Sequence, residues 1–121
     1  MKTTGSAHSI VIEKNPNRVI ITFNGKVIAD SQQALVLREG PLPPALYLPR
    51  KDVEMSLLQP TEHMTHCPFK GDAAFLSIQV DGKSAENVAW TYESPIPAVA
   101  QIKDYLAFYK EKMDAIEELS S

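Results

Sequence analysis

The sequence lacks a second cysteine, a long apolar run and a large excess of either charge, and each absence excludes a class of protein. A single cysteine in 121 residues cannot form an internal disulfide, which fits a reducing compartment. The longest apolar runs are only a few residues long, so no segment is expected to span a membrane. Twelve Lys and Arg against fifteen Asp and Glu give a net charge of −3, without the basic stripe typical of nucleic-acid-binding proteins.

The composition is that of a small globular domain. Hydrophobic residues make up 44% of the chain and charged residues 22%, which argues against disorder. Residues 1–6 (Met-Lys-Thr-Thr-Gly-Ser) lack the apolar core of a signal peptide, so we expect a cytoplasmic protein. We expect one domain over residues 1–121, with its core at about 10–118 and a flexible stretch at 1–8. The composition does not indicate an oligomeric state.

Runs of β-branched residues predict strands on both sides of a proline-rich middle. The expected strands are residues 9–12, 18–23, 26–30, 34–38, 73–80 and 85–92. Asn24-Gly25 and Asp81-Gly82 each separate two such runs. These pairs predict β-hairpins, because a type I′ turn needs a positive φ at both central residues.

Prolines set the expectation for the middle of the chain. Six of the nine prolines lie between Gly40 and Phe69, so this segment is predicted to be irregular, with at most a short helical turn at 52–58. Asp52 is the expected N-cap of that turn. The sequence predicts antiparallel sheets that, together with this segment, enclose a cleft.

The periodicity changes after the second group of strands. From Ala98 onward the apolar residues follow helical spacing and predict one C-terminal helix; they are Val99, Ile102, Leu106 and Tyr109. Residues 113–116 fit either an extension of this helix or a short strand, and we favour the strand. The predicted fold class is mainly β with one C-terminal helix.

Residues 61–71 hold the densest group of reactive side chains. A tight turn from Pro68 to Gly71 would bring Lys70 close to Cys67, and a nearby ammonium lowers the pKa of a thiol. Cys67, Lys70 and His66 are therefore the candidate catalytic residues, with His66 or His63 moving protons. The alternative is that Cys67 is a small buried hydrophobe without chemistry.

The same segment contains metal-binding side chains. Glu62, His63, His66 and Cys67 are potential donors, but structural zinc sites draw ligands from two knuckles and the sequence has only one. We predict no metal and no cofactor.

Two further segments contain candidate ligand-binding residues. Arg50 offers a planar cation suited to carboxylate or phosphate, although it could equally be a solvated surface residue. Trp90 and Tyr92 alternate onto one face of a predicted strand. They form either part of the core or a stacking wall for a planar ligand.

Several segments together resemble the domain-of-unknown-function 427 family over about residues 10–118. They are 27–31 (Val-Ile-Ala-Asp-Ser), 47–53 (Tyr-Leu-Pro-Arg-Lys-Asp-Val), 65–71 (Thr-His-Cys-Pro-Phe-Lys-Gly), 90–95 (Trp-Thr-Tyr-Glu-Ser-Pro) and 108–109 (Phe-Tyr). The resemblance implies bent antiparallel sheets in a tent-like, Mss4-like architecture in small, mostly bacterial proteins, and it supplies no reaction. Related architectures hold zinc with cysteine pairs, which Cys67 alone cannot provide.

Three hypotheses follow. The first is binding or sensing of a small anionic or polar, planar molecule in a cleft by residues Tyr47, Arg50, Lys70, Trp90 and Tyr92. The second is an enzyme that uses Cys67 as a nucleophile or redox thiol. The third is a structural or protein-interaction domain. Neither a nucleic acid nor a membrane is an expected partner.

Overall fold

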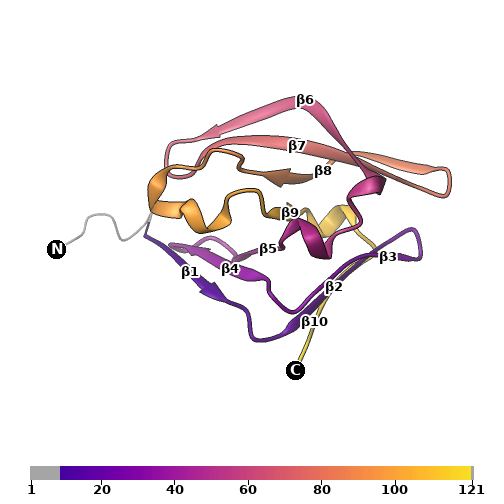
Figure 1. The fold of residues 1–121 in the computed structure, drawn as a ribbon, viewed down its shortest axis with the longest axis horizontal. Helices are drawn as coiled ribbons and strands as arrows, with labels where there is room; N and C mark the ends of the chain where they lie inside the picture. The colour runs from indigo at the N-terminus through magenta and orange to yellow at the C-terminus, as the bar shows by residue number, and fades with distance from the viewer. Residues whose placement is uncertain (1–8, 121) are drawn as a thin grey trace.

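The computed structural model describes residues 9–120 and is mainly β (Figure 1). Residues 1–8, for which the sequence predicts flexibility, lie outside the described residues. The strands are β1 (Ile10–Lys14), β2 (Arg18–Phe23), β3 (Lys26–Ser31), β4 (Leu35–Glu39), β5 (Ala45–Tyr47), β6 (Leu58–Cys67), β7 (Gly71–Val80), β8 (Lys83–Thr91), β9 (Leu106–Phe108) and β10 (Ala115–Leu119). Short 3-10 turns complete the fold: η2 (Arg50–Asp52), η3 (Met55–Leu57), η4 (Pro97–Ile102) and η5 (Lys110–Lys112).

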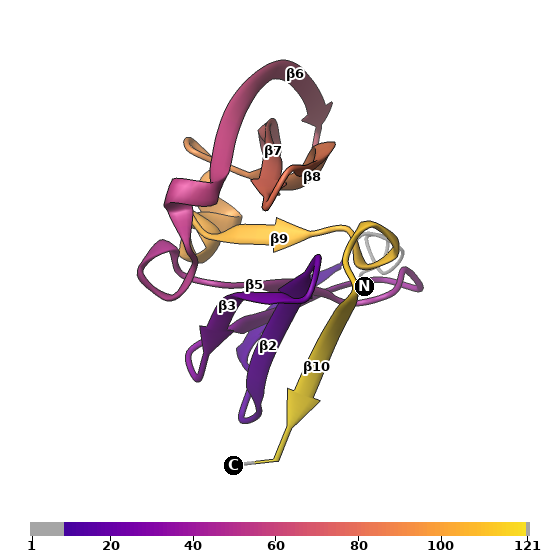
Figure 2. The ribbon, with the colours of Figure 1, turned by 90° about the vertical axis from the view of Figure 1, so that its right-hand side faces the viewer.

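The strands form three open antiparallel sheets. Their orders are β1-β4-β5, β10-β2-β3 and β6-β7-β8-β9. The four-stranded sheet lies on one side of the molecule, and its strand β9 runs closest to the two smaller sheets (Figure 2). Leu48 and Leu106 exchange two backbone hydrogen bonds of 2.8 Å, which join the segment after β5 to β9. This junction connects the four-stranded sheet to the rest of the domain.

Both predicted hairpins are confirmed. Asn24 and Gly25 have φ values of 50° and 76°, and Asp81 and Gly82 have values of 48° and 83°. Positive φ at both central residues is the geometry that a type I′ turn requires. The turns connect β2 to β3 and β7 to β8, and each pair of strands has one register shift further from its turn.

Two groups of buried side chains fill the space between the sheets. The larger includes Val19, Ile21, Ile28, Leu48, Ile78, Val88 and Leu106. Each fully buried aliphatic side chain of this kind contributes about 1.5–3 kcal/mol. The smaller group contains Tyr47, Phe75, Tyr92, Ile102 and Ala107 and supports the candidate site described below.

The predicted C-terminal helix is wrong. Residues Pro97–Ile102 form a 3-10 turn interrupted at Val99, and Asp104 then takes a positive φ of 64°. Leu106–Phe108 are all buried and pair with β8 as strand β9. The helical spacing was misleading because Val99, Ile102 and Leu106 reach the core from a turn and a strand.

No helix within residues 9–120 is long and apolar enough to cross a membrane.

Two further predictions concern the middle and the end of the chain. The proline-rich middle is not irregular throughout, because Ala45–Tyr47 and Leu58–Cys67 are strands. Strand β6 contains Pro60. An edge strand tolerates proline because only one of its two sides donates hydrogen bonds to a neighbouring strand. The strand favoured for residues 113–116 is confirmed as β10, shifted to Ala115–Leu119.

Candidate functional site

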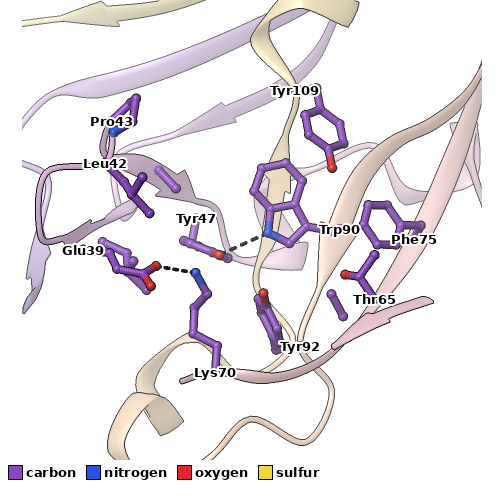
Figure 3. A pocket seen from close by; sticks show the side chains of 13 residues that line it. Glu39, Leu42, Pro43, Tyr47, Thr65, Lys70, Phe75, Trp90, Tyr92 and Tyr109 are labelled. Atoms are coloured by element: carbon purple, nitrogen blue, oxygen red, sulfur yellow. Dashed lines mark hydrogen bonds and ion pairs between the residues drawn. The ribbon is translucent and has the colours of Figure 1, made fainter. Parts of the chain in front are cut away.

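A cavity of ≈ 230 Å³ lies where β4 and β5 meet the inner face of β6, β7 and β8 (Figure 3). Four of the residues singled out in the sequence line it: Tyr47, Lys70, Trp90 and Tyr92. The other lining residues are Leu37, Glu39, Leu42, Pro43, Ala45, Thr65, Ala73, Phe75 and Tyr109. The cavity thus combines aromatic walls with one charged pair and several hydroxyl groups.

The charged pair joins Lys70 to Glu39. The Lys70 Nζ donates a hydrogen bond of 2.7 Å to Glu39 Oε1, and the two side chains are only 15% and 9% exposed. At this distance the carboxylate largely neutralises the ammonium. The pair therefore offers a local donor and a local acceptor with little net charge.

The turn from Pro68 to Gly71 holds Lys70 in place. Lys70 donates its backbone N–H to Cys67 O at 3.2 Å and accepts from Ile96 N at 2.9 Å. Gly71 has a φ of +115°, and a Cβ there would lie 3.4 Å from the backbone oxygen of Ser94. Glycine is favoured here because a φ of +115° is rarely adopted by residues with a side chain, and the turn also packs against the segment that follows β8. This contact brings the 65–71 and 90–95 motifs together.

Aromatic side chains form the opposite wall. The Trp90 Nε1–H donates a hydrogen bond of 3.1 Å to the Tyr47 hydroxyl, and the two rings meet edge to face with their centroids 6.3 Å apart. Tyr109 lies against Trp90 with a centroid distance of 4.7 Å and stacks on Phe75 at 6.4 Å. These contacts fix the ring orientations before any ligand binds.

Burial keeps both core tyrosines protonated. It raises the pKa of Tyr47 to about 12, with a smaller opposing effect of the Trp90 hydrogen bond. Burial also raises the pKa of Tyr92 well above its ordinary value, aided by the negative charges of neighbouring groups. The Tyr92 hydroxyl points into the cavity (Figure 3) and forms no hydrogen bond with another residue of the described chain. It is available to a ligand as a neutral donor and acceptor.

The candidate catalytic residues are not assembled around Cys67. Cys67 is a half-buried free thiol on the same face of β6 as Thr65. His66 faces the other side of the strand, where its Nδ1 lies 2.7 Å from Asp72 Oδ1 and both side chains are exposed. Lys70 is paired with Glu39 instead. Among residues 9–120, no base forms a hydrogen bond with the thiol.

Arg50 lies away from the cavity. Its Nε donates a hydrogen bond of 2.8 Å to Asp104 O, and its Nη2 lies 3.5 Å from Thr91 Oγ1. The predicted N-cap role of Asp52 is wrong, because its carboxylate accepts a hydrogen bond of 2.7 Å from Ser31 and no side chain caps η3. Arg50 therefore connects η2 to Asp104, and Asp52 connects it to Ser31 in β3.

Sequence reasoning missed several lining residues. Glu39 closes a strand without any motif of its own, and only the structure reveals its partner Lys70. The sequence predicts a helix that contains Tyr109, although residues 108–109 are among the segments that resemble the family. Thr65 and Phe75 belong to facing strands that the sequence did not pair. Within residues 9–120 no group of three or more metal-ligating side chains comes together.

Comparison with known proteins identifies the family. No curated protein matches the chain. The family model of the domain of unknown function DUF427, also labelled NTP_transf_9, matches residues 11–119. The match spans β1 to β10 and includes every residue that lines the cavity. The chain belongs to the DUF427 family.

Proposed function

We propose that this protein binds a small, planar, uncharged polar molecule in the ≈ 230 Å³ cavity. The observation that carries this proposal is the convergence of a neutralised Lys70–Glu39 pair with a preformed aromatic wall. Ligand sites commonly combine apolar walls with a few placed polar groups.

The electrostatics favour an uncharged ligand over an anion. Lys70 alone would attract a carboxylate or phosphate, but Glu39 Oε1 lies 2.7 Å from its ammonium and would repel one. Arg50, the second cation of the original hypothesis, does not line the cavity. A ligand group that both donates and accepts, such as a primary amide, complements the pair and the Tyr92 hydroxyl.

The aromatic geometry supports a flat ligand. Trp90, Phe75 and Tyr109 offer ring faces and edges on one side of the cavity (Figure 3). Aromatic pairs gain about 0.5–1.5 kcal/mol beyond the area they bury. An aromatic amide would use both the rings and the polar end.

Benzamide and benzoate test this proposal as a matched pair of probes. Trp90 is the chain's single tryptophan, so its indole N–H gives one NMR signal, and that group borders the cavity. We expect benzamide to shift this signal in a saturable manner with a dissociation constant in the millimolar range, and benzoate to bind more weakly. Equal or tighter binding of benzoate would contradict an uncharged ligand.

Two variants connect binding to the cavity. Tyr92→Phe removes one hydroxyl and should weaken benzamide binding about fivefold, the equivalent of one hydrogen bond of about 1 kcal/mol. Tyr105→Phe is the matched control, because Tyr105 does not line the cavity. If neither probe shifts the indole signal, a structural or protein-interaction domain becomes the better hypothesis.

The remaining expectations belong with this proposal. The open antiparallel sheets are compatible with the tent-like, Mss4-like architecture that the resemblance implies. A cytoplasmic location and a bacterial source also stay predictions. The enzyme hypothesis would need a base for Cys67, and the paired Lys70 and outward-facing His66 do not favour it.

A further inference from the structure

A second and larger cavity, of ≈ 890 Å³, adjoins the first. The two share one wall, formed by Leu42, Pro43, Ala45, Trp90 and Tyr109. Neither cavity is closed off from solvent. A bound molecule could therefore pass from one cavity to the other along the open side of this wall.

The second cavity differs from the first in chemistry. Its deep wall is aliphatic and aromatic and comes from several strands; it includes Ile21, Val36, Leu46, Leu48, Phe108 and Ile116. Apolar surface of this kind gains most from contact with hydrocarbon.

Charged side chains surround the apolar wall of the second cavity, and they have mixed signs. They are Glu13, Lys14, Arg38, Lys110, Glu111 and Glu118, all exposed. Three positive and three negative groups give no preference for either charge. The apolar wall, rather than the rim, therefore determines what this cavity accommodates.

The shared wall lies at the end of the first cavity that is away from Lys70 and Tyr92. Figure 3 shows Leu42, Pro43 and Tyr109 at one end, with Lys70 and Tyr92 at the other. Leu42 is 56% exposed, so its side chain has room to move when a ligand crosses the wall. A molecule with its polar group at Lys70 would direct its far end toward the second cavity.

We infer that the ligand is amphipathic, with its planar polar head in the first cavity and an apolar tail along the second. This inference rests on the proposed function and names the class of molecule. The polar head satisfies Lys70, Glu39 and the Tyr92 hydroxyl. The tail covers Leu46 and Ile116, which are half-buried, whereas Ile21, Leu48 and Phe108 of the same wall are already buried.

A series of benzamides with alkyl chains of increasing length at the para position tests the inference. Dissociation constants come from titration of the Trp90 indole signal. Each added methylene should tighten binding about twofold to fourfold, the upper value corresponding to complete burial. The tightening should begin with the first carbons that pass the shared wall.

Ile116→Thr keeps a β-branched side chain in strand β10 and adds a hydroxyl to the second cavity alone. It should weaken 4-hexylbenzamide about fivefold and leave benzamide unchanged. Val27→Thr is the matched control, since Val27 is 49% exposed and lines neither cavity. It should leave both dissociation constants unchanged.

The possible results separate the two proposals. If benzamide binds but longer chains do not bind more tightly, the amphipathic ligand is wrong and the proposed function stands. If tightening occurs and Ile116→Thr and Val27→Thr affect it equally, the chain does not occupy the second cavity and the inference is also wrong. If no member of the series shifts the indole signal, both proposals fail.

Discussion

Replacing Lys70 by methionine would leave the Glu39 carboxylate inside the protein without its partner. The Lys70 Nζ and Glu39 Oε1 atoms are 2.7 Å apart, and both side chains are mostly buried. At an effective dielectric constant of about 20, two unit charges at this separation attract by about 6 kcal/mol. Most of this attraction offsets the cost of removing both groups from water.

Breaking one side of the pair should therefore cost more than removing both charges. We expect Lys70→Met and Glu39→Gln each to lower the free energy of unfolding by about 3 kcal/mol, because each leaves one buried charge unpaired. The double variant Lys70→Met/Glu39→Gln should remain within about 1 kcal/mol of the unmodified protein. For a domain of this size, a loss of 3 kcal/mol lowers Tm by about 10–15 °C.

Urea unfolding followed by circular dichroism measures all four members of this cycle. For two coupled buried charges, the destabilisation caused by the two single substitutions sums to more than that of the double substitution. If each single substitution costs less than about 1 kcal/mol, or if the two costs simply add, Lys70 and Glu39 are not a coupled buried pair. Far-ultraviolet spectra of the folded variants serve as the control for an unchanged fold.

Stability should fall between pH 10 and about 12, because the unfolded chain loses the Tyr47 proton near pH 10 while burial raises the folded pKa to about 12. The loss amounts to about 3 kcal/mol, is absent below pH 10, and should shrink in Tyr47→Phe when unfolding is measured against pH. Gly71→Ala should cost about 1–3 kcal/mol in urea unfolding, more than Gly82→Ala, because the φ of +115° at Gly71 lies further from the left-handed region open to L residues than the +83° at Gly82. Cys67 should react with iodoacetamide at neutral pH no faster than the urea-unfolded chain does, because Lys70 is paired with Glu39 and does not activate the thiol.

Each of these three expectations has an outcome that contradicts it. A Tyr47→Phe protein that loses stability as steeply as the unmodified one above pH 10 would remove Tyr47 as the cause. Equal costs for Gly71→Ala and Gly82→Ala would show that the backbone conformation at Gly71 is not the cause of the cost. Rapid alkylation of Cys67 in the folded protein would restore the cysteine-enzyme hypothesis.

Local signals in the sequence predicted the hairpins well. Asn24-Gly25 and Asp81-Gly82 determine turns through their own backbone preferences, which do not depend on distant residues. The strand at Arg18–Phe23 was predicted with its observed bounds. Elements that depend on distant partners were harder to predict from the sequence. Leu106–Phe108 is a strand because β8 and Leu48 supply its hydrogen bonds.

The candidate site likewise contains residues that the sequence identified and contacts that depend on distant partners. The sequence singled out Tyr47, Lys70, Trp90 and Tyr92, and the structure places all four around one cavity. It could not reveal that Glu39 would neutralise Lys70, because their proximity depends on the packing of β4 against the turn after β6. Nor could a motif show that Arg50, although close to Tyr47 in sequence, donates a hydrogen bond to Asp104 and does not line the cavity.

The pairing of β10 with β2 has a consequence for how the chain is made. Ile21 lies opposite Ile116, so the β10-β2-β3 sheet joins segments that are far apart in the sequence. When β2 and β3 leave the ribosome, one edge of β2 remains unpaired until residues 115–119 have been synthesised. Such distant pairings slow folding and expose an aggregation-prone edge in the meantime. The unpaired edge of β2 is therefore exposed while the residues between β3 and β10 are synthesised, and a chaperone would protect the chain most during that period.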